Sequence, residues 1–148
     1  MDFEQLAFIE KWRRNAARGV VVALDGTRGD LLVTLRVGEL GERLDLRGRD
    51  ATGALRKARL TIGDRATMAI EYAARDVAAG SGGGVSGDLV APGALVEGTV
   101  GAAGDVVVVD VGAASVLVKA ETLPGVSVGD VVRFTIADEG RAYYIPGR

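Results

Sequence analysis

The chain has 148 residues, 48% hydrophobic and 26% charged, a composition typical of a folded protein rather than a disordered one. It has no cysteine and no histidine, which excludes disulfides, thiol nucleophiles, the usual zinc sites and catalysis by a histidine base. The net charge is −2, but residues 1–66 carry 13 Lys/Arg against 10 Asp/Glu. A polyanionic partner would therefore more readily contact the first half.

No apolar run approaches the roughly 18 residues of a membrane helix. The N-terminal residues also lack the basic and apolar pattern of a signal peptide. We therefore expect a cytoplasmic protein without a membrane partner.

The N-terminal region, residues 1–18, is predicted to be helical. Asp2 is a suitable N-cap, and Gly19 a suitable stop for a helix over residues 2–17. Apolar side chains fall on one broad face at helical spacing. We expect Trp12, on this face, to pack against the rest of the fold.

From Gly19 onward, apolar and polar residues alternate with a period of two, which predicts strands separated by Gly-Asp turns. Five short strands with close turns favour a small β-barrel over residues 19–76. The predicted strands are residues 20–24, 31–37, 43–47, 56–62 and 66–72.

Residues 77–92 lose this periodicity, and their glycine-rich stretch predicts a flexible linker. A second barrel is predicted over residues 93–148. The expected fold is therefore mainly β: an N-terminal helix and two tandem five-stranded small barrels. The strands of the second barrel are predicted at residues 95–100, 105–111, 115–120, 131–137 and 141–145.

The two halves share turn motifs, which indicates a degenerate repeat. Gly63-Asp64 and Gly129-Asp130 each precede an alternating strand, and so do Gly29-Asp30 and Gly104-Asp105. After the last of these turns, Asp110 makes Val107, Val109 and Val111 the expected inward set. This is a shift of one residue relative to the first half.

The second half resembles small β-barrels of the OB, S1, SH3-like and TOBE-like kinds. The resemblance is carried by residues 96–100 (VEGTV), 108–112 (VVDVG) and 124–136 (PGVSVGDVVRFTI). It covers residues 94–146 and, more faintly, 19–76. It implies a binding module, and tandem TOBE-like barrels imply a small oxyanion held at their interface.

Sequence motifs that would indicate a catalytic, nucleotide-binding or metal site are weak. Residues 82–87 (GGGVSG) match G-x-G-x-x-G, but no strand leads into them and no helix follows, which favours a linker over a nucleotide site. Several aspartates lie beside glycine, as turn residues do: Asp25, Asp30, Asp64, Asp105 and Asp130. We expect no catalytic residue, no metal ligand and no cofactor.

The best candidate site is a basic face of the first barrel. Alternation places four cations on the outward face of two strands that we expect to form a hairpin, and two more in the loop between them. Such a face suits single-stranded nucleic acid, which also needs aromatic side chains on which its bases stack. Tyr72 is expected to be buried, and only one of Tyr143 and Tyr144 is expected to be exposed. The alternative is a solvated strand face. The six residues are Arg43, Arg47, Arg49, Arg56, Lys57 and Arg59.

The sequence thus predicts a non-enzymatic binding protein, with weak single-stranded nucleic-acid binding as the leading hypothesis. The alternative is a protein–protein scaffold or a homo-oligomer, formed through the valine-rich strand at residues 106–109. A small-oxyanion module is the third possibility.

Overall fold

The structure is a computed structural model that describes residues 13, 15–27, 29–38, 42–81 and 84–146. Within these residues the chain is mainly β, as predicted, and its strands belong to one 12-stranded sheet. The predicted helix over residues 2–17, with Trp12, lies almost wholly outside the described residues. No helix among the described residues is long and apolar enough to span a membrane.

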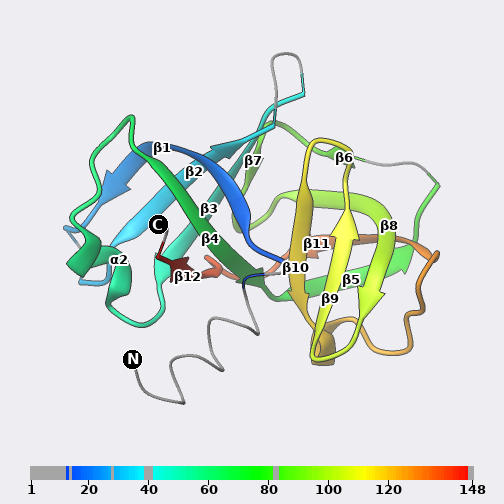
Figure 1. Ribbon diagram of the computed structural model, residues 1–148. Coiled ribbons are helices and arrows are strands. Elements are labelled where there is room, and N and C mark those ends of the chain that lie inside the picture. The colour runs from blue at the N-terminus through cyan, green and yellow to red at the C-terminus, as the bar shows by residue number, and fades with distance from the viewer. Residues whose placement is uncertain (1–12, 14, 28, 39–41, 82–83, 147–148) are drawn as a thin grey trace.

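Five strands close into a small barrel, which we call the first unit (Figure 1). Their order around the barrel is β1-β2-β3-β12-β4, and β4 pairs back onto β1. Neighbouring strands are antiparallel except β3 and β12, which are parallel. The strands are β1 (Ala17–Asp25), β2 (Leu32–Val37), β3 (Leu44–Asp50), β4 (Arg65–Tyr72) and β12 (Arg141–Ile145).

The placement of β12 corrects a sequence-based expectation. Residues 141–145 form the predicted strand, but it completes the first unit rather than a barrel within residues 93–148. Figure 1 shows this strand, in red, among the blue and cyan strands of the first half. Ala142 pairs with Ile70 of β4 and, on the other side, with Asp50 of β3. Alternation identifies a strand but says nothing about which neighbours it will have.

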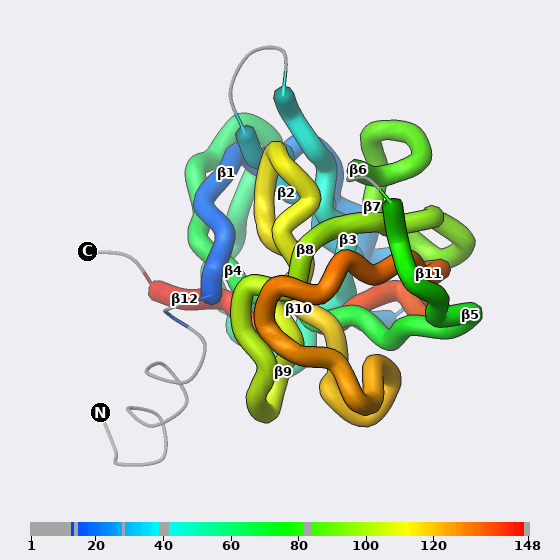
Figure 2. Tube along the Cα trace, turned by 90° about the vertical axis from the view of Figure 1, so that its right-hand side faces the viewer, coloured from blue at the N-terminus to red at the C-terminus, as the bar shows by residue number. Residues whose placement is uncertain are grey.

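The remaining long strands form what we call the second unit. They follow the order β10-β9-β8-β11-β5, and β10 pairs in parallel with the last residues of β4. Because β4 leads through Ala73 into β5, one continuous segment contributes to both units (Figure 2). The strands are β5 (Ala74–Ala79), β8 (Leu95–Ala103), β9 (Val106–Asp110), β10 (Ser115–Lys119) and β11 (Val131–Ile136).

The segment expected to be a flexible linker, residues 77–92, takes part in the sheet instead. It holds the end of β5 and two short strands, β6 (Gly84–Val85) and β7 (Leu89–Val90). β6 pairs with β8 and β7 pairs with β3. Val90 is fully buried, so apolar burial and strand pairing override the glycine-rich composition.

The strand predicted over residues 56–62 is wrong. The chain forms a short helix there, α2 (Ala54–Ala58), and then turns into β4. Asp50 caps this helix, because its carboxylate accepts the amide protons of Leu55 at 3.3 Å and Arg56 at 3.1 Å. Leu55, a residue of this helix, is fully buried. Ile62, expected to face inward, is 67% exposed.

The buried side chains alternate along β3 and β9 as the sequence predicts, whereas β2, β4 and β10 each contain three successive buried residues. Val33 and Leu35 of β2 are fully buried. In β9 the inward set is Val107, Val109 and the following Val111, so the predicted one-residue shift of face is confirmed. One large apolar cluster contains side chains from both units. A second cluster on the outer side contains Ala69, Leu117 and Ile145.

Candidate functional site

The cations expected on a single hairpin face come from different elements. Arg47 and Arg49 lie on β3, whereas Arg56 and Lys57 lie on α2 and Arg59 is its left-handed C-cap. The hairpin that would have joined them does not exist, so the structure does not bring these residues to one strand face as predicted.

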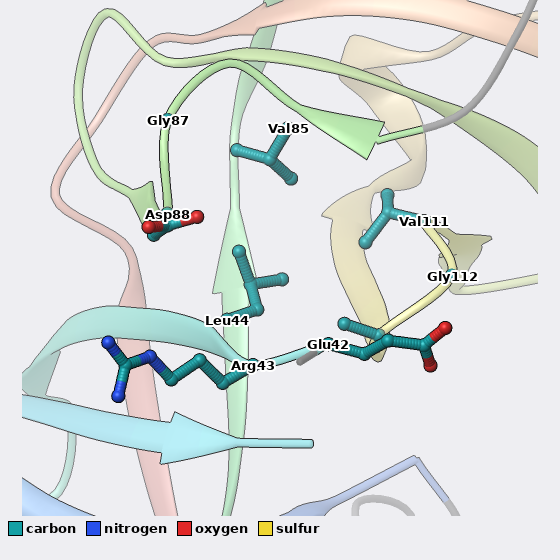
Figure 3. A pocket seen from close by; sticks show the side chains of 9 residues that line it. Glu42, Arg43, Leu44, Val85, Gly87, Asp88, Val111 and Gly112 are labelled. Atoms are coloured by element: carbon teal, nitrogen blue, oxygen red, sulfur yellow. The ribbon is translucent and has the colours of Figure 1, made fainter. Parts of the chain in front are cut away.

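Arg43 immediately precedes β3 and lies beside a pocket of about 260 Å³, which is lined by the start of β3, the segment after β6 and residues 111–113. Figure 3 shows its side chain and that of Glu42 extending to opposite sides of this pocket. Asp88 lies on the same side as Arg43. Two carboxylates therefore line the pocket with this one guanidinium group, which makes it unsuitable for a polyanion.

Two of the predicted residues have internal partners. Arg56 donates from Nη2 to the backbone carbonyl of Gly29 at 2.6 Å and so holds the loop between β1 and β2. The Nε atom of Arg47 lies 3.8 Å from Oε2 of Glu139, in the turn before β12. Both side chains therefore connect segments of the first unit.

A different set of arginines converges on a cleft of about 580 Å³ in the first unit. Cross-strand pairing explains how they meet. Val20 of β1 is directly opposite Arg36 of β2 on one side and Arg65 of β4 on the other. Directly opposite residues share a face, so these three side chains form one row. Arg18, two residues before Val20, is opposite Thr67 and extends this face. We call this cleft the arginine cleft.

Among the described residues that line the arginine cleft there are three arginines and no aspartate or glutamate. Asp45 pairs with Arg36 from outside the lining, with Nε–Oδ1 and Nη2–Oδ2 distances of 2.9 and 3.1 Å. The hydrogen bond and charge of Asp45 raise the pKa of Arg36. Among the described residues, Arg18 and Arg65 have no ion pair. Within the described part of the chain, two of the three positive charges therefore have no ion-pair partner.

The backbone beneath this row requires a glycine. A Cβ atom at Gly19 would overlap the carbonyl oxygen of Arg36, because β1 crosses very close to β2 at this point. Gly38, with φ +89°, turns the chain out of β2 at the edge of the cleft. The two glycines thus permit the close approach of β1 to β2 and the turn at the edge of the cleft.

The exchanged strand β12 brings an aromatic residue to this site. Tyr144 lines the arginine cleft and is half-buried. Tyr143 is half-buried as well, and desolvation raises its pKa. Neither tyrosine is fully exposed, contrary to the expectation for one of them.

The second unit has the same row of positions with different side chains. Thr99 of β8 is opposite Asp110 of β9 and Val131 of β11, as Val20 is opposite Arg36 and Arg65. Glu97 takes the place of Arg18. Here the adjoining space is filled by the chain itself, because β6 pairs with β8 and the amide of Ser81 donates to Glu97 Oε2 at 3.2 Å.

Sequence reasoning missed the arginine cleft because its cations lie on three separate strands. One signal was present in the sequence. Arg18, Arg36 and Arg65 each lie within two residues of a glycine at a strand bend or turn. Aligning those glycines between the halves would have placed acidic or apolar residues at the same positions in the second half.

Among the described residues, no three histidine, cysteine, aspartate or glutamate side chains are grouped as metal ligands would be. Comparison of the chain with protein-family models, curated proteins and solved structures found no match.

Proposed function

We propose that this chain is a non-enzymatic binding protein that holds an extended polyanion in the arginine cleft. The observation that carries the proposal is the row of Arg36 and Arg65 flanking Val20, with Arg18 beside it. The part of the lining that the structure describes contains no carboxylate. Guanidinium groups bind phosphate and carboxylate oxygens through paired, charge-assisted hydrogen bonds. The cleft volume of about 580 Å³ lies within the range of ligand sites.

Single-stranded nucleic acid, the leading hypothesis from the sequence, is one form of this proposal, with its site moved to the arginine cleft. Strands 2 and 3 of OB-type barrels are a common nucleic-acid surface, and here they carry Arg36, Arg47 and Arg49. A stacking platform is also required. Among the described lining residues, the aromatic one is Tyr144. An acidic segment of a protein partner is the second form.

The other sequence-based hypotheses receive less support. The strand at residues 106–109, suggested as a free edge for oligomer formation, lies in β9, which pairs with β8 and β10 on its two sides. The amides near the Gly-Asp turns, suggested as an oxyanion nest, are used internally. Thr61 donates to Asp64 at 2.8 Å, and Ser127 donates to Asp130 at 2.9 Å.

The finer fold assignment, two tandem barrels of the OB, S1 or TOBE kind, is part of the same proposal. The closed first unit supports it, with its parallel β3–β12 pair and a helix between β3 and β4. The second unit has a parallel β10–β4 pair and a short 3₁₀ helix (Ala120–Thr122) between β10 and β11. Each unit would then take its fifth strand from the other half of the chain.

The test is binding of a labelled single-stranded oligonucleotide and of a labelled acidic peptide at about 50 and 200 mM salt. We expect at least one ligand to bind at low salt and to weaken at high salt. The double variant Arg18→Glu/Arg65→Glu should lose about tenfold or more, because two charge-assisted contacts become repulsive. The control Arg43→Glu/Lys57→Glu makes the same change in net charge at predicted residues outside the cleft.

Absence of binding by both ligands at low salt would overturn the proposal. So would an equal loss in the two double variants, because general electrostatic attraction would then explain the binding. A loss confined to Arg43→Glu/Lys57→Glu would move the site to the residues that the sequence predicted.

A further inference from the structure

Among the described residues, one edge of β1 has no partner beside the arginine cleft. β1 pairs with β4 from Ala17 to Val20, but its pairing with β2 begins only at Val20. On the β2 side, residues 17–19 therefore lack a strand partner within the described part of the chain. A second void of about 300 Å³ extends along this edge. Its lining includes Ala17, Arg18 and Gly38 of the first unit and residues 113–115 of the second.

The hydrogen bonds of Val21 show which residue faces the open edge. Val21 donates to the carbonyl of Asp64 at 2.9 Å and accepts from Gly63 at 2.8 Å, so both of its backbone groups point toward β4. Backbone groups alternate between the two edges of a strand. The N–H and C=O of Arg18, three residues earlier, therefore point to the open edge.

The second unit shows which kind of segment occupies the edge that corresponds to that of Arg18. Val100 donates to Asp130 and accepts from Gly129, both at 2.8 Å, which makes it the counterpart of Val21. The counterpart of Arg18 is then Glu97, whose edge is occupied by β6. Glu97 is opposite Gly84 in an antiparallel pair, and Ser86 donates to the carbonyl of Leu95 at 2.8 Å. An extended polypeptide segment thus fills this place in the second unit.

From this correspondence, and resting on the proposed function, we infer that the arginine cleft binds an acidic polypeptide segment as an added antiparallel strand on β1. The backbone of Arg18 would pair with the segment as the backbone of Glu97 pairs with β6. Main-chain hydrogen bonds supply the affinity in this mode of recognition, and side chains supply the specificity. The specificity here is for acidic residues, because arginines replace Glu97 and Asp110 of the second unit.

The same geometry disfavours nucleic acid. An open strand edge offers donors and acceptors at the spacing of another polypeptide backbone. Single-stranded nucleic acid gains much of its affinity from stacking on aromatic faces. Tyr144 packs against the large apolar cluster and is half-buried, so it offers little free ring surface.

The experiment compares three labelled probes with the full chain at about 50 mM salt. The first is an extended peptide of alternating glutamate and valine. The second has the same sequence with alternate backbone amides N-methylated, and the third is an oligothymidylate of equal charge. Hydrogen exchange at the Arg18 amide is measured with each probe.

We expect the unmodified peptide to bind about tenfold or more tightly than the N-methylated one, because N-methylation removes main-chain donors and leaves the charge. We also expect it to slow exchange at Arg18, and Arg18→Glu/Arg65→Glu to abolish the effect. Equal binding of the two peptides, or unchanged exchange at Arg18, would overturn strand addition. Binding of the oligothymidylate alone would also overturn it, while the proposed function would stand. If none of the three probes binds, both the strand-addition inference and the proposed function are wrong.

Discussion

The two units have equivalent strand pairings, Gly-Asp turns and close-approach glycines, which we call the backbone frame. They differ in the side chains that this frame carries. Val21 and Val100 each make one pair of hydrogen bonds to a Gly-Asp turn, at 2.8 to 2.9 Å in both units. Ile62 and Val128, which precede those turns, are each 67% exposed. The two Gly-Asp turns are therefore equivalent in hydrogen bonding and exposure.

The glycines of the frame are equivalent as well. A Cβ atom at Gly98 would overlap the carbonyl oxygen of Asp110, as one at Gly19 would overlap that of Arg36. Gly38 and Gly112 both have positive φ, at +89° and +100°. Glycine is thus required where the chain bends or crosses closely, and the side chains between these positions are free to differ.

The two units differ in the row of side chains formed by one residue of the first strand and its two cross-strand partners. The first unit has Arg36, Val20 and Arg65, and its cleft is open, whereas the second has Asp110, Thr99 and Val131, with β6 alongside. One frame therefore supports two roles. It binds its own chain in the second unit, and in the first it presents a charged cleft for which we propose an external ligand.

The largest expected effect tests whether the two units unfold together. Met68 and Phe134 each lie four residues after the aspartate of their turn, and both are fully buried. Phe134→Ala should lower the free energy of unfolding by about 3–5 kcal/mol and Met68→Ala by about 2–5 kcal/mol, because each leaves a cavity. We expect a single urea transition for both variants, since β12 and the β4–β5 segment connect the units.

Circular dichroism and tyrosine fluorescence followed through the same urea titration would check this. Two separate transitions, with only one displaced by each substitution, would show that the units are independent despite the shared strands.

A smaller effect tests the close crossing of strands. Gly19→Ala and Gly98→Ala should each destabilise the protein by about 1–3 kcal/mol, because the added methyl group displaces a backbone carbonyl. Gly101→Ala is the matched control on β8, since the nearest atom to its Cβ would be 3.9 Å away. We expect this control to stay within about 0.5 kcal/mol of the parent protein in urea titrations. Equal effects at Gly98 and Gly101 would contradict the crossing.

Much of the frame could be predicted from the sequence, because local patterns determine it. Alternation located β2, β4 and the strands of the second half, and the buried Tyr72 was correctly anticipated. Gly-Asp pairs located the turns. These features depend on residues close together in the chain, so a single sequence contains the necessary information.

The failures concern contacts that alternation does not encode. Residues 56–62 alternate in sequence, but capping by Asp50 and burial of Leu55 stabilise a helix over part of them. The partners of β12 lie about 70 to 90 residues earlier in the chain. The arginine cleft needs that same pairing information, because Arg18, Arg36 and Arg65 meet only when three strands align.

The smallest expected effect concerns a position where the units differ in a titratable group. Tyr72 and Asp138 each lie eight residues after the aspartate of their turn. The Tyr72 hydroxyl is buried and donates to the carbonyl of Arg47 at 2.7 Å, and desolvation raises its pKa well above the ordinary value of 10.0. The Asp138 carboxylate instead accepts the amide of Ala73 at 2.9 Å.

A raised pKa in the folded state means that the folded protein retains the Tyr72 proton after the unfolded chain has lost it. The associated stability is therefore complete below about pH 10 and falls above it, by up to about 1.4 kcal/mol per pH unit for one group. Tyr72→Phe should cost about 1 kcal/mol at neutral pH through the lost hydrogen bond and should flatten this alkaline decline. Urea midpoints between about pH 8 and 11, with Tyr143→Phe as the half-buried control, measure both effects. An unchanged alkaline slope in Tyr72→Phe would mean that other groups cause the decline, and that this difference between the units has no effect on stability.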